Sequence, residues 1–341
     1  MDSCFVLRFR LVLKKLRSPK FWSEKDSTIV KILKPISKLY SLIASARINN
    51  VTPEKASVPV ICVGNVVLGG AGKTPTVELV CDILRTEGFT PHILTAGYGG
   101  YLKNVVKVDI NLHSYLQVGD EALLSATVAP TWVGKNRVNS GKAAVLAGAN
   151  ILVMDDGFQN NSIEKDFKIL VVDSCQEFGN EHLFPAGPLR ESIESGVKKS
   201  DVVLVIGEKN ENLENKIKKF RSNIQICYAK MEVVSSVEAN NNKIVGFCGL
   251  GYPEKFKKTL INCGYEIMDF IAFSDHHPYT ITEIQKLIKG AQNVGATLVT
   301  TMKDYVKIPE VFKKDMSVIS IKLKLENDDF KNLLLTSINK K

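Results

Sequence analysis

Apolar residues recur in two rhythms along most of this chain, and their alternation predicts an α/β fold. Short continuous apolar runs are typical of strands that are buried on both faces of a parallel sheet. Between them, apolar positions return at helical spacing, as in residues 76–85. Strands that alternate with helices favour a doubly wound, mostly parallel sheet. The predicted strands are 58–63, 92–95, 105–110, 150–154, 169–172 and 202–206.

A polar stretch at 209–242 interrupts this pattern, and a second strand and helix pattern begins at 243–251. Apolar runs near 297–301 and 317–321 make this second part α/β as well. We therefore expect three parts in 341 residues. They are a basic amphipathic segment over 1–47, a nucleotide-binding domain over 48–235 and a second, smaller α/β domain over 236–341.

The positive charge is concentrated at the start of the chain. The net charge is +9, and residues 1–47 hold eleven Lys and Arg side chains against three acidic ones. In the first 22 residues these cations alternate with apolar and aromatic residues. A second helix is predicted to have Pro35 in its first turn and to end at Arg47, with Ile36, Leu39, Tyr40 and Ile43 on one face.

Two such segments in succession favour contact with an anionic membrane surface. Packing on the domain with solvated lysines is the alternative. The rest of the chain is nearly neutral, which argues against a nucleic-acid partner.

The sequence argues against a membrane-spanning, secreted, disulfide-bonded or zinc-binding protein. No apolar run reaches the roughly 18 residues that span a bilayer, and the start lacks a signal-peptide cleavage pattern. Seven cysteines are scattered and never form C-x-x-C, so we expect neither disulfides nor a zinc site, as suits a reducing cytoplasm.

A glycine-rich loop joins the first predicted strand to the helix at 76–85, which is the context of a phosphate-binding loop. Its glycines can turn backbone N–H groups toward phosphate, and the helix dipole adds positive potential. Val67 stands where the strict pattern has its first glycine, and an ordinary glycine turn with a lone lysine is the alternative. The candidate nucleotide contacts are Gly69, Gly70, Ala71, Gly72, Lys73, Thr74 and Pro75.

Asp155 ends the apolar run at 150–154 and is followed by Asp156 and Gly157. A carboxylate at this strand end can hold Mg²⁺ beside the Thr74 hydroxyl, whereas a turn before glycine is the alternative. The chain has no Asn-Lys-x-Asp guanine signature, which favours adenine as the base of the nucleotide. The candidate Mg²⁺ ligands are Thr74, Glu121, Asp155 and Asp156.

Two other motifs carry titratable groups. Asp120 and Glu121 open an apolar helical stretch, where they either stabilise the helix start or serve phosphoryl transfer as proton acceptor and metal ligand. Asp275, His276 and His277 either form an acid/base group or precede a capped helix near 282.

Two loops suggest substrate contacts, one after the second predicted strand and one rich in proline. Tyr98 in the glycine-rich segment 97–100 offers a stacking or hydroxyl contact. Arg190 and Glu191 close the proline-rich loop 184–191, and the Arg190 guanidinium can bind phosphate with two hydrogen bonds. Ordinary turn chemistry is the alternative for both loops.

Taken together, these motifs resemble the tetraacyldisaccharide 4′-kinase family, the lipid A kinases of Gram-negative bacteria. The resemblance runs from Phe21-Trp22 through most of the chain. Each motif is weak alone, but their order is specific. The motifs are 64–65, 69–75, 97–100, 119–121, 155–159, 185–191, 249–256, 275–276 and 300–304.

The resemblance implies transfer of the ATP γ-phosphoryl group, with Mg²⁺, to the 4′-hydroxyl of tetraacyldisaccharide 1-phosphate. It implies a P-loop kinase domain joined to the smaller domain by linker strands. It further implies that Asp120 and His276 form a catalytic dyad. The partners implied are an acylated disaccharide lipid and the cytoplasmic face of the bacterial inner membrane, where the protein is peripheral, with no obligate protein partner.

The chain departs from the family pattern at two positions. Ala96 replaces the usual arginine before Gly-Tyr-Gly, and Asn160 replaces the usual histidine after Asp-Gly-aromatic-Gln. The residues before Phe21 also look longer than the family's start. The alternative functions are a membrane-associated P-loop ATPase or GTPase switch and a small-molecule P-loop synthetase or kinase.

Overall fold

The computed structural model describes residues 19–24, 27–49, 51–234 and 242–339, with the side chains of 43–49 excepted. The chain divides into two compact units. The large unit comprises Lys20–Glu232 and Lys322–Lys341, and the small unit contains Val233–Ile321. The predicted boundary at 235 and 236 lies outside the described residues and stays a prediction.

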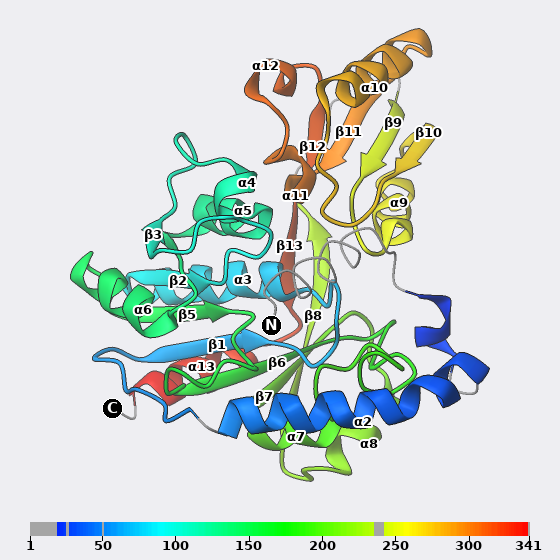
Figure 1. Ribbon diagram of the computed structural model, residues 1–341. Coiled ribbons are helices and arrows are strands. Elements are labelled where there is room, and N and C mark those ends of the chain that lie inside the picture. The colour runs from blue at the N-terminus through cyan, green and yellow to red at the C-terminus, as the bar shows by residue number, and fades with distance from the viewer. Residues whose placement is uncertain (1–18, 25–26, 50, 235–241, 340–341) are drawn as a thin grey trace, which may run out of the picture. The chain divides into compact units, whose positions relative to one another are not determined.

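A nine-stranded sheet forms the centre of the large unit, with the order β13-β8-β7-β6-β1-β5-β2-β4-β3 (Figure 1). Its central strands pair in parallel, and β3 is antiparallel to its neighbour β4. The hydrogen bonds that flank β8 and β13, from Val234 N to Ser320 O and from Glu326 N to Tyr228 O, make this edge pair antiparallel as well. This confirms the predicted mostly parallel, doubly wound sheet. The strands are β1 (Val60–Gly64), β2 (Pro91–Thr95), β3 (Val106–Lys107), β4 (Thr131–Val133), β5 (Ile151–Asp155), β6 (Phe167–Asp173), β7 (Val202–Ile206), β8 (Gln225–Val233) and β13 (Ile321–Leu325).

Helices cover both faces of this sheet because its central strands are apolar on both sides. Along β1, Val60 and Cys62 belong to one core cluster, whereas Ile61 and Val63 belong to the other. Helices α6 (Arg137–Leu146), α7 (Ile193–Lys199) and α8 (Glu211–Lys218) contribute to the first cluster. Helices α3 (Lys73–Thr86) and α13 (Asp329–Asn339) contribute to the second. This unit also contains η1 (Lys20–Ser23), α4 (Tyr115–Val118) and α5 (Asp120–Val128).

Three elements differ from the sequence expectations. The strand predicted at 105–110 is only the two-residue β3, a half-exposed edge strand. Helix α2 (Thr28–Asn49) begins seven residues before Pro35, which lies inside it, so the predicted start was wrong. Strand β13 joins the large sheet, so the units divide the chain differently from the predicted domains at this end. The first predicted amphipathic segment comprises residues 1–22, of which 1–18 lie outside the described residues.

The small unit has its own four-stranded sheet, with parallel pairings and the order β10-β9-β11-β12. Separate core clusters lie around α10 and α9. The strands are β9 (Lys243–Cys248), β10 (Glu266–Ala272), β11 (Thr297–Thr301) and β12 (Ser317–Ile319), and the helices are α9 (Pro253–Asn262), α10 (Ile281–Asn293), α11 (Met302–Tyr305) and α12 (Glu310–Lys313). In the described part of the chain, no helix combines the length and apolarity needed to span a bilayer.

Candidate active site

The glycine-rich loop leaves the carboxyl end of β1 and enters α3 at Lys73. Gly69 and Gly72 have φ values of 115° and 87°, in the left-handed region that favours glycine. A Cβ at Gly70 would meet no atom within 4 Å, so a ligand can approach this backbone closely. The loop therefore has the open, turned backbone that a phosphate group requires.

Val67 has a structural role that accounts for its departure from the strict pattern. It forms an isolated antiparallel bridge with Leu189. On either side, Leu68 N donates to Pro188 O at 2.7 Å and Arg190 N donates to Val66 O at 2.8 Å. Residue 67 is extended and pairs with a distant loop, which brings Arg190 and Glu191 beside the glycine-rich loop.

Lys73 points toward the end of strand β5. Its Nζ lies 3.4 Å from Asn65 Oδ1 and 3.8 Å from Asp156 Oδ1. Asn65 is fully buried, and its backbone carbonyl accepts a 2.9 Å hydrogen bond from Gln159 Nε2. Sequence patterns assigned no separate role to Asn65 or Gln159, since their convergence on Lys73 depends on contacts between distant segments.

Asp155 has the environment of a cation ligand. It lies opposite Val63 in the β1–β5 pairing, is 2% exposed, and its Oδ1 has no hydrogen-bond partner. Burial, followed by the nearby carboxylates Glu121 and Asp156, raises the pKa of Asp155 to about 7. A buried, unpartnered carboxylate oxygen is stabilised by a bound cation, so this site fits Mg²⁺.

No group of three or more Asp, Glu, His or Cys side chains within the described ranges is arranged to hold a metal by itself. This agrees with the chemistry of Mg²⁺, which is commonly held by one or two carboxylates together with phosphate oxygens and water. The remaining ligands would therefore come from a nucleotide.

Asp156 differs from its neighbour because cations surround it. Arg190 Nη1 donates to both of its carboxylate oxygens at 2.8 Å. Burial opposes ionisation, but Lys73 and Arg190 lower the pKa of Asp156 below its usual range. Arg190 also donates to Gln159 Oε1 at 3.3 Å. Asp156 is thus an ionised anchor for two cations, and its predicted contact with Mg²⁺ stays a prediction.

Glu191 is likewise engaged within the protein. Its Oε1 accepts hydrogen bonds from Lys199 Nζ at 2.6 Å and from Gln159 Nε2 at 2.8 Å. The contacts of Arg190 and Glu191 with substrate stay predictions.

Sequence patterns missed Arg137, which is buried at the start of α6. Its Nη1 donates to the carbonyl of Thr95 at 2.6 Å and to that of Gly134, at the ends of β2 and β4. Burial lowers the pKa of Arg137 to about 10, although Asp155 and Asp156 oppose this shift. Nothing in the local sequence distinguishes this arginine from a surface one.

Asp120 and Glu121 begin helix α5, and Asp120 is buried. Asp120 Oδ1 accepts a 3.0 Å hydrogen bond from Glu121 N, so its carboxylate stabilises the helix start. Gly119, with φ 91°, precedes them, and a Cβ there would collide with the carbonyl of Tyr98. The close packing of these two loops explains why glycine is needed and places the exposed Tyr98 beside the start of α5.

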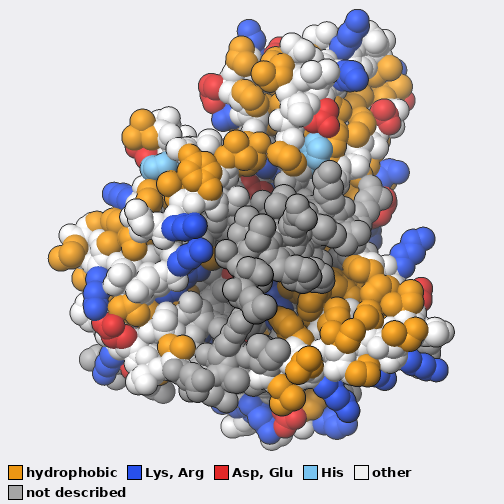
Figure 2. All heavy atoms as spheres, in the orientation of Figure 1, with side chains coloured by type: hydrophobic (Ala, Val, Ile, Leu, Met, Phe, Trp, Pro, Cys, Tyr) orange, Lys and Arg blue, Asp and Glu red, His pale blue; other side chains and the backbone are white. Residues whose placement is uncertain are grey.

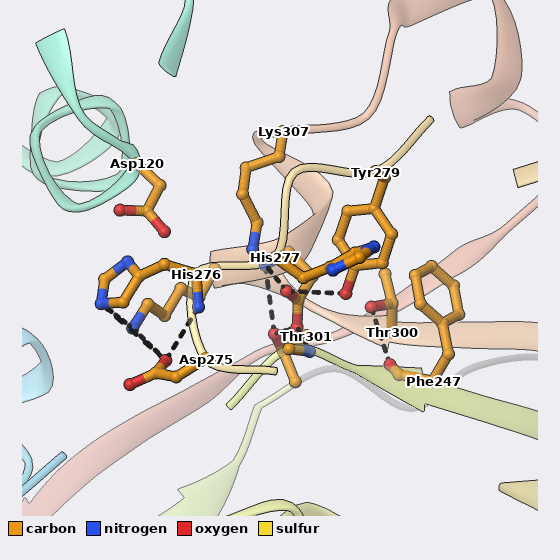
Figure 3. Close-up of polar contacts among 12 residues, drawn as sticks. Asp120, Phe247, Asp275, His276, His277, Tyr279, Thr300, Thr301 and Lys307 are labelled. Carbon is orange, nitrogen blue, oxygen red and sulfur yellow. Dashed lines mark hydrogen bonds and ion pairs between the residues drawn. The ribbon is translucent and has the colours of Figure 1, made fainter. Parts of the chain in front are cut away.

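In the small unit, the two adjacent histidines have different environments (Figure 3). His277 Nε2 lies 3.2 Å from both carboxylate oxygens of Glu283, which also takes part in the capping box of α10. Its ring stacks on Phe273 at 4.6 Å. His276 instead has φ 55°, and its Nε2 is 3.2 Å from Lys303 Nζ. The helix-cap interpretation therefore describes His277 but not His276.

Asp120 belongs to the large unit and His276 to the small unit. Each is described within its own unit, and their predicted pairing stays a prediction.

A family model described as Tetraacyldisaccharide-1-P 4'-kinase matches residues 29–339. The chain belongs to this family. The tetraacyldisaccharide 4'-kinase of Rhodospirillum rubrum is 39% identical over 310 residues, covering 90% of this chain and 93% of the relative. The tetraacyldisaccharide 4'-kinase of Paramagnetospirillum magneticum is 38% identical over 309 residues, covering 90% of this chain and 94% of the relative.

A solved structure supports the same assignment. The crystal structure of LpxK from Aquifex aeolicus, in complex with ATP, is similar to this chain with a TM-score of 0.72 and 25% identity. The match covers 91% of this chain and 100% of that one. These matches confirm the predicted family, the kinase class of enzyme and the P-loop kinase-like fold, and they do not favour the switch-protein alternative.

Proposed function

We propose that this protein transfers the γ-phosphoryl group of ATP to the 4′-hydroxyl of tetraacyldisaccharide 1-phosphate. The observation that carries the proposal is the pairing of the open glycine-rich loop with Asp155, whose buried oxygen lacks a partner, in a chain of this kinase family. Phosphoryl transfer depends mostly on positioning and charge neutralisation, which these groups can supply.

The nucleotide would be held by the backbone N–H groups of residues 69–74 and by Lys73, with Pro75, which has no N–H, beside it. Thr74 and Asp155 would hold Mg²⁺, with Glu121 and Asp156 as further candidates through water. The bound ion would neutralise charge on the transferring group. For Lys73 to reach the β- and γ-phosphates, its Nζ must leave Asp156, and Arg190 then remains to keep that carboxylate paired.

The acceptor would be activated by Asp120, which takes the 4′-hydroxyl proton, while His276 tunes this base. Tyr98 would contact the sugar from the neighbouring loop, and Arg190 and Glu191 would contact substrate from the loop paired with Val67. Because Ala96 and Asn160 lack the usual arginine and histidine side chains, contacts to the acceptor there must differ from those of the family.

We also propose that the protein is peripheral at the cytoplasmic face of the inner membrane, with helix α2 in contact with lipid. Apolar side chains of α2 are exposed beside three lysines, and Figure 2 shows hydrophobic side chains gathered over this helix. This composition suits the boundary of an anionic bilayer. The exposed apolar residues are Ile29, Ile32, Ile36, Leu39 and Leu42, and the cations are Lys31, Lys34 and Lys38.

The opposite side of α2 is fixed to the proline-rich loop. Ser37 Oγ donates to Leu183 O at 2.9 Å, and Tyr40 packs edge-on against Phe184 at 5.4 Å. Nearby, Trp22 Nε1 donates to Pro185 O at 3.2 Å. A lipid contact at α2 would therefore hold the loop that carries Arg190 near the membrane surface. We expect neither a nucleic-acid partner nor an obligate protein partner.

The deciding experiment measures ATP turnover and lipid phosphorylation by the full chain, with and without the acylated disaccharide in mixed micelles. A kinase requires the lipid for turnover and forms one phosphorylated lipid for each ADP. Hydrolysis that is independent of the lipid, with no phosphorylated lipid, would identify a P-loop switch instead.

A further inference from the structure

Lys303 lies against the histidine that we place in the reaction, although sequence patterns assigned it no role. Its Nζ is 3.2 Å from His276 Nε2 and 3.2 Å from Asp275 Oδ1. All three residues belong to the small unit, so these contacts lie within one compact body. Their side chains are mostly buried, with 21% to 31% exposed, which favours a defined geometry over a mobile surface pair.

The donor count of lysine determines the protonation form of His276 in this arrangement. An ammonium group has three N–H donors and no acceptor. Nε2 of His276 also lies 3.8 Å from Asp275 Oδ1, but the ammonium at 3.2 Å is the nearer group. The nearer contact favours a lone pair on Nε2, which places the proton of the neutral ring on Nδ1. The Asp275 carboxylate balances the charge of Lys303. Its Oδ1 also accepts a 3.1 Å hydrogen bond from the backbone N–H of His276.

The backbone of His276 is held from a second direction. Its φ of 55° is in the left-handed region, which is uncommon for residues other than glycine although histidine is among those enriched there. His276 N donates to Gly249 O at 3.3 Å, and Gly249 N in turn donates to Asp304 Oδ2 at 2.9 Å. Lys303 and Asp304 are adjacent in α11, so this short helix supports both the ring and the backbone of His276.

Asp304 is itself fixed by several partners, which makes α11 a rigid support. It is fully buried, and its carboxylate accepts hydrogen bonds from Tyr279 Oη at 3.0 Å and Thr301 Oγ1 at 2.8 Å (Figure 3). Lys307 Nζ lies 2.8 Å from Asp304 Oδ1. A Cβ at Gly249 would lie 3.0 Å from Asp304 Oδ1, so the close approach of these two segments favours glycine.

We propose that Lys303 is a positioning residue for phosphoryl transfer. It holds His276 as the neutral Nδ1–H tautomer and fixes the orientation of the ring, so that His276 acts through its Nδ1–H. This inference rests on the proposed role of His276 in the kinase reaction. The neighbouring His277 cannot substitute, because its Nε2 is held by Glu283.

The test compares three variants of the full chain. Lys303→Met removes the donors but keeps an unbranched side chain, and Lys303→Arg keeps a cation that can only donate. Lys313→Met is the matched control, because Lys313 lies in the same unit and has an ion pair with Glu310 at 2.8 Å. Steady-state kinetics supply kcat and KM for both substrates. Long-range ¹H–¹⁵N correlation spectra of protein labelled with ¹⁵N-histidine supply the tautomer of His276, which a merely structural role would not change.

We expect Lys303→Met to lower kcat about 10- to 100-fold, the size of effect seen when a group that orients a functional histidine is removed. The KM for ATP should change little. Its His276 signal should move from the Nδ1–H toward the Nε2–H pattern. Lys303→Arg should recover much of the kcat and of the Nδ1–H signal. Lys313→Met should match wild type in both measurements. If Lys303→Met does not fold, Asp275→Asn, which removes the charge that holds the ammonium, should move the His276 signal in the same direction.

Two negative outcomes separate the inference from the proposed function. A wild-type spectrum with the Nε2–H pattern, or wild-type kcat in Lys303→Met, overturns the inference when His276→Gln still lowers kcat. If His276→Gln itself retains wild-type kcat, or if the chain forms no phosphorylated lipid, the proposed function fails, and the tautomer spectra then report on the Lys303 contact alone.

Discussion

Arg190 donates to both carboxylate oxygens of Asp156 through the same nitrogen, at 2.8 Å each. The pair joins a loop that follows β6 to the residue after β5, and Lys73 lies 3.8 Å from the same carboxylate. Asp156 therefore shares its negative charge between Arg190 and Lys73, and in the proposed mechanism Lys73 moves away from it to bind phosphate.

Replacement of Arg190 should weaken nucleotide binding through Lys73. In Arg190→Met, Asp156 keeps only Lys73 as a close cation, which should hold Lys73 away from the phosphates. We expect the KM for ATP to rise about tenfold, the cost of one charge-assisted hydrogen bond. Lys198→Met, which removes an exposed pair with Glu194, is the control. An unchanged KM in Arg190→Met would contradict this coupling.

Lys73→Met should abolish nucleotide-dependent phosphorylation. The variant keeps the buried side-chain stem but removes the only charge in the loop that can reach the β- and γ-phosphates. We expect loss of detectable product with a melting temperature close to that of wild type, measured in parallel. Turnover within tenfold of wild type would be incompatible with the assigned role.

Asp120→Asn should lower kcat at least about 100-fold without changing ATP affinity, because it removes a proton acceptor but keeps the size of the side chain. Nucleotide affinity is measured by calorimetry, and kcat by the lipid assay. Glu194→Gln, an exposed carboxylate in the same unit, is the control. Wild-type turnover in Asp120→Asn would remove this residue from the reaction.

Asp155 should make stability depend on pH when Mg²⁺ and nucleotide are absent. Its pKa is raised from 3.8 to about 7 in the folded protein, so between these values the folded state binds a proton that the unfolded state has lost. The free energy of unfolding should therefore fall as pH rises from about 4 to 7, by at most about 4 kcal/mol. Urea unfolding in EDTA at pH 5 and pH 7 measures this change.

Asp155→Asn provides the control for that measurement, since an amide does not titrate. Its free energy of unfolding should fall less over the same pH range, and it should lose Mg²⁺-dependent kinase activity. An identical pH dependence in wild type and variant would show that other groups are responsible.

The predictable part of the fold was the part determined by local patterns. Continuous apolar runs identified β1, β5, β6 and β7, because strands buried on both faces have apolar residues at every position. Strand β8 was missed, since its last four residues are exposed and alternate between charged and apolar side chains instead of forming a continuous apolar run. The start of α2 was misjudged because proline is usual in a first turn, whereas Pro35 lies in the interior of the helix.

In the candidate site, the glycine-rich loop and the strand-end Asp155 were predictable because each depends on neighbours in sequence. The pairing of Val67 with Leu189 and the burial of Arg137 were not predictable, because both depend on contacts between distant segments. The different environments of His276 and His277 likewise depend on Lys303 and Glu283, which no spacing rule connects to them.

Helix α2 supplies the last prediction, which concerns the membrane. Ile32 and Leu42 are each 68% exposed, so a charged residue at either position disturbs no packing. Ile32→Glu and Leu42→Glu together should reduce association with vesicles containing anionic lipid, because they add negative charge and remove apolar contact at the bilayer boundary. Leu146→Glu is the matched control, since Leu146 is 89% exposed on α6.

Sedimentation with vesicles measures binding, and a soluble assay of ATP affinity reports the integrity of the nucleotide site. We expect the double variant to bind vesicles at least tenfold more weakly than the control while ATP affinity stays unchanged. Equal vesicle binding by the double variant, Leu146→Glu and wild type would show that α2 is not the lipid contact. Loss of binding in Leu146→Glu as well would mean that added negative charge alone repels the anionic surface.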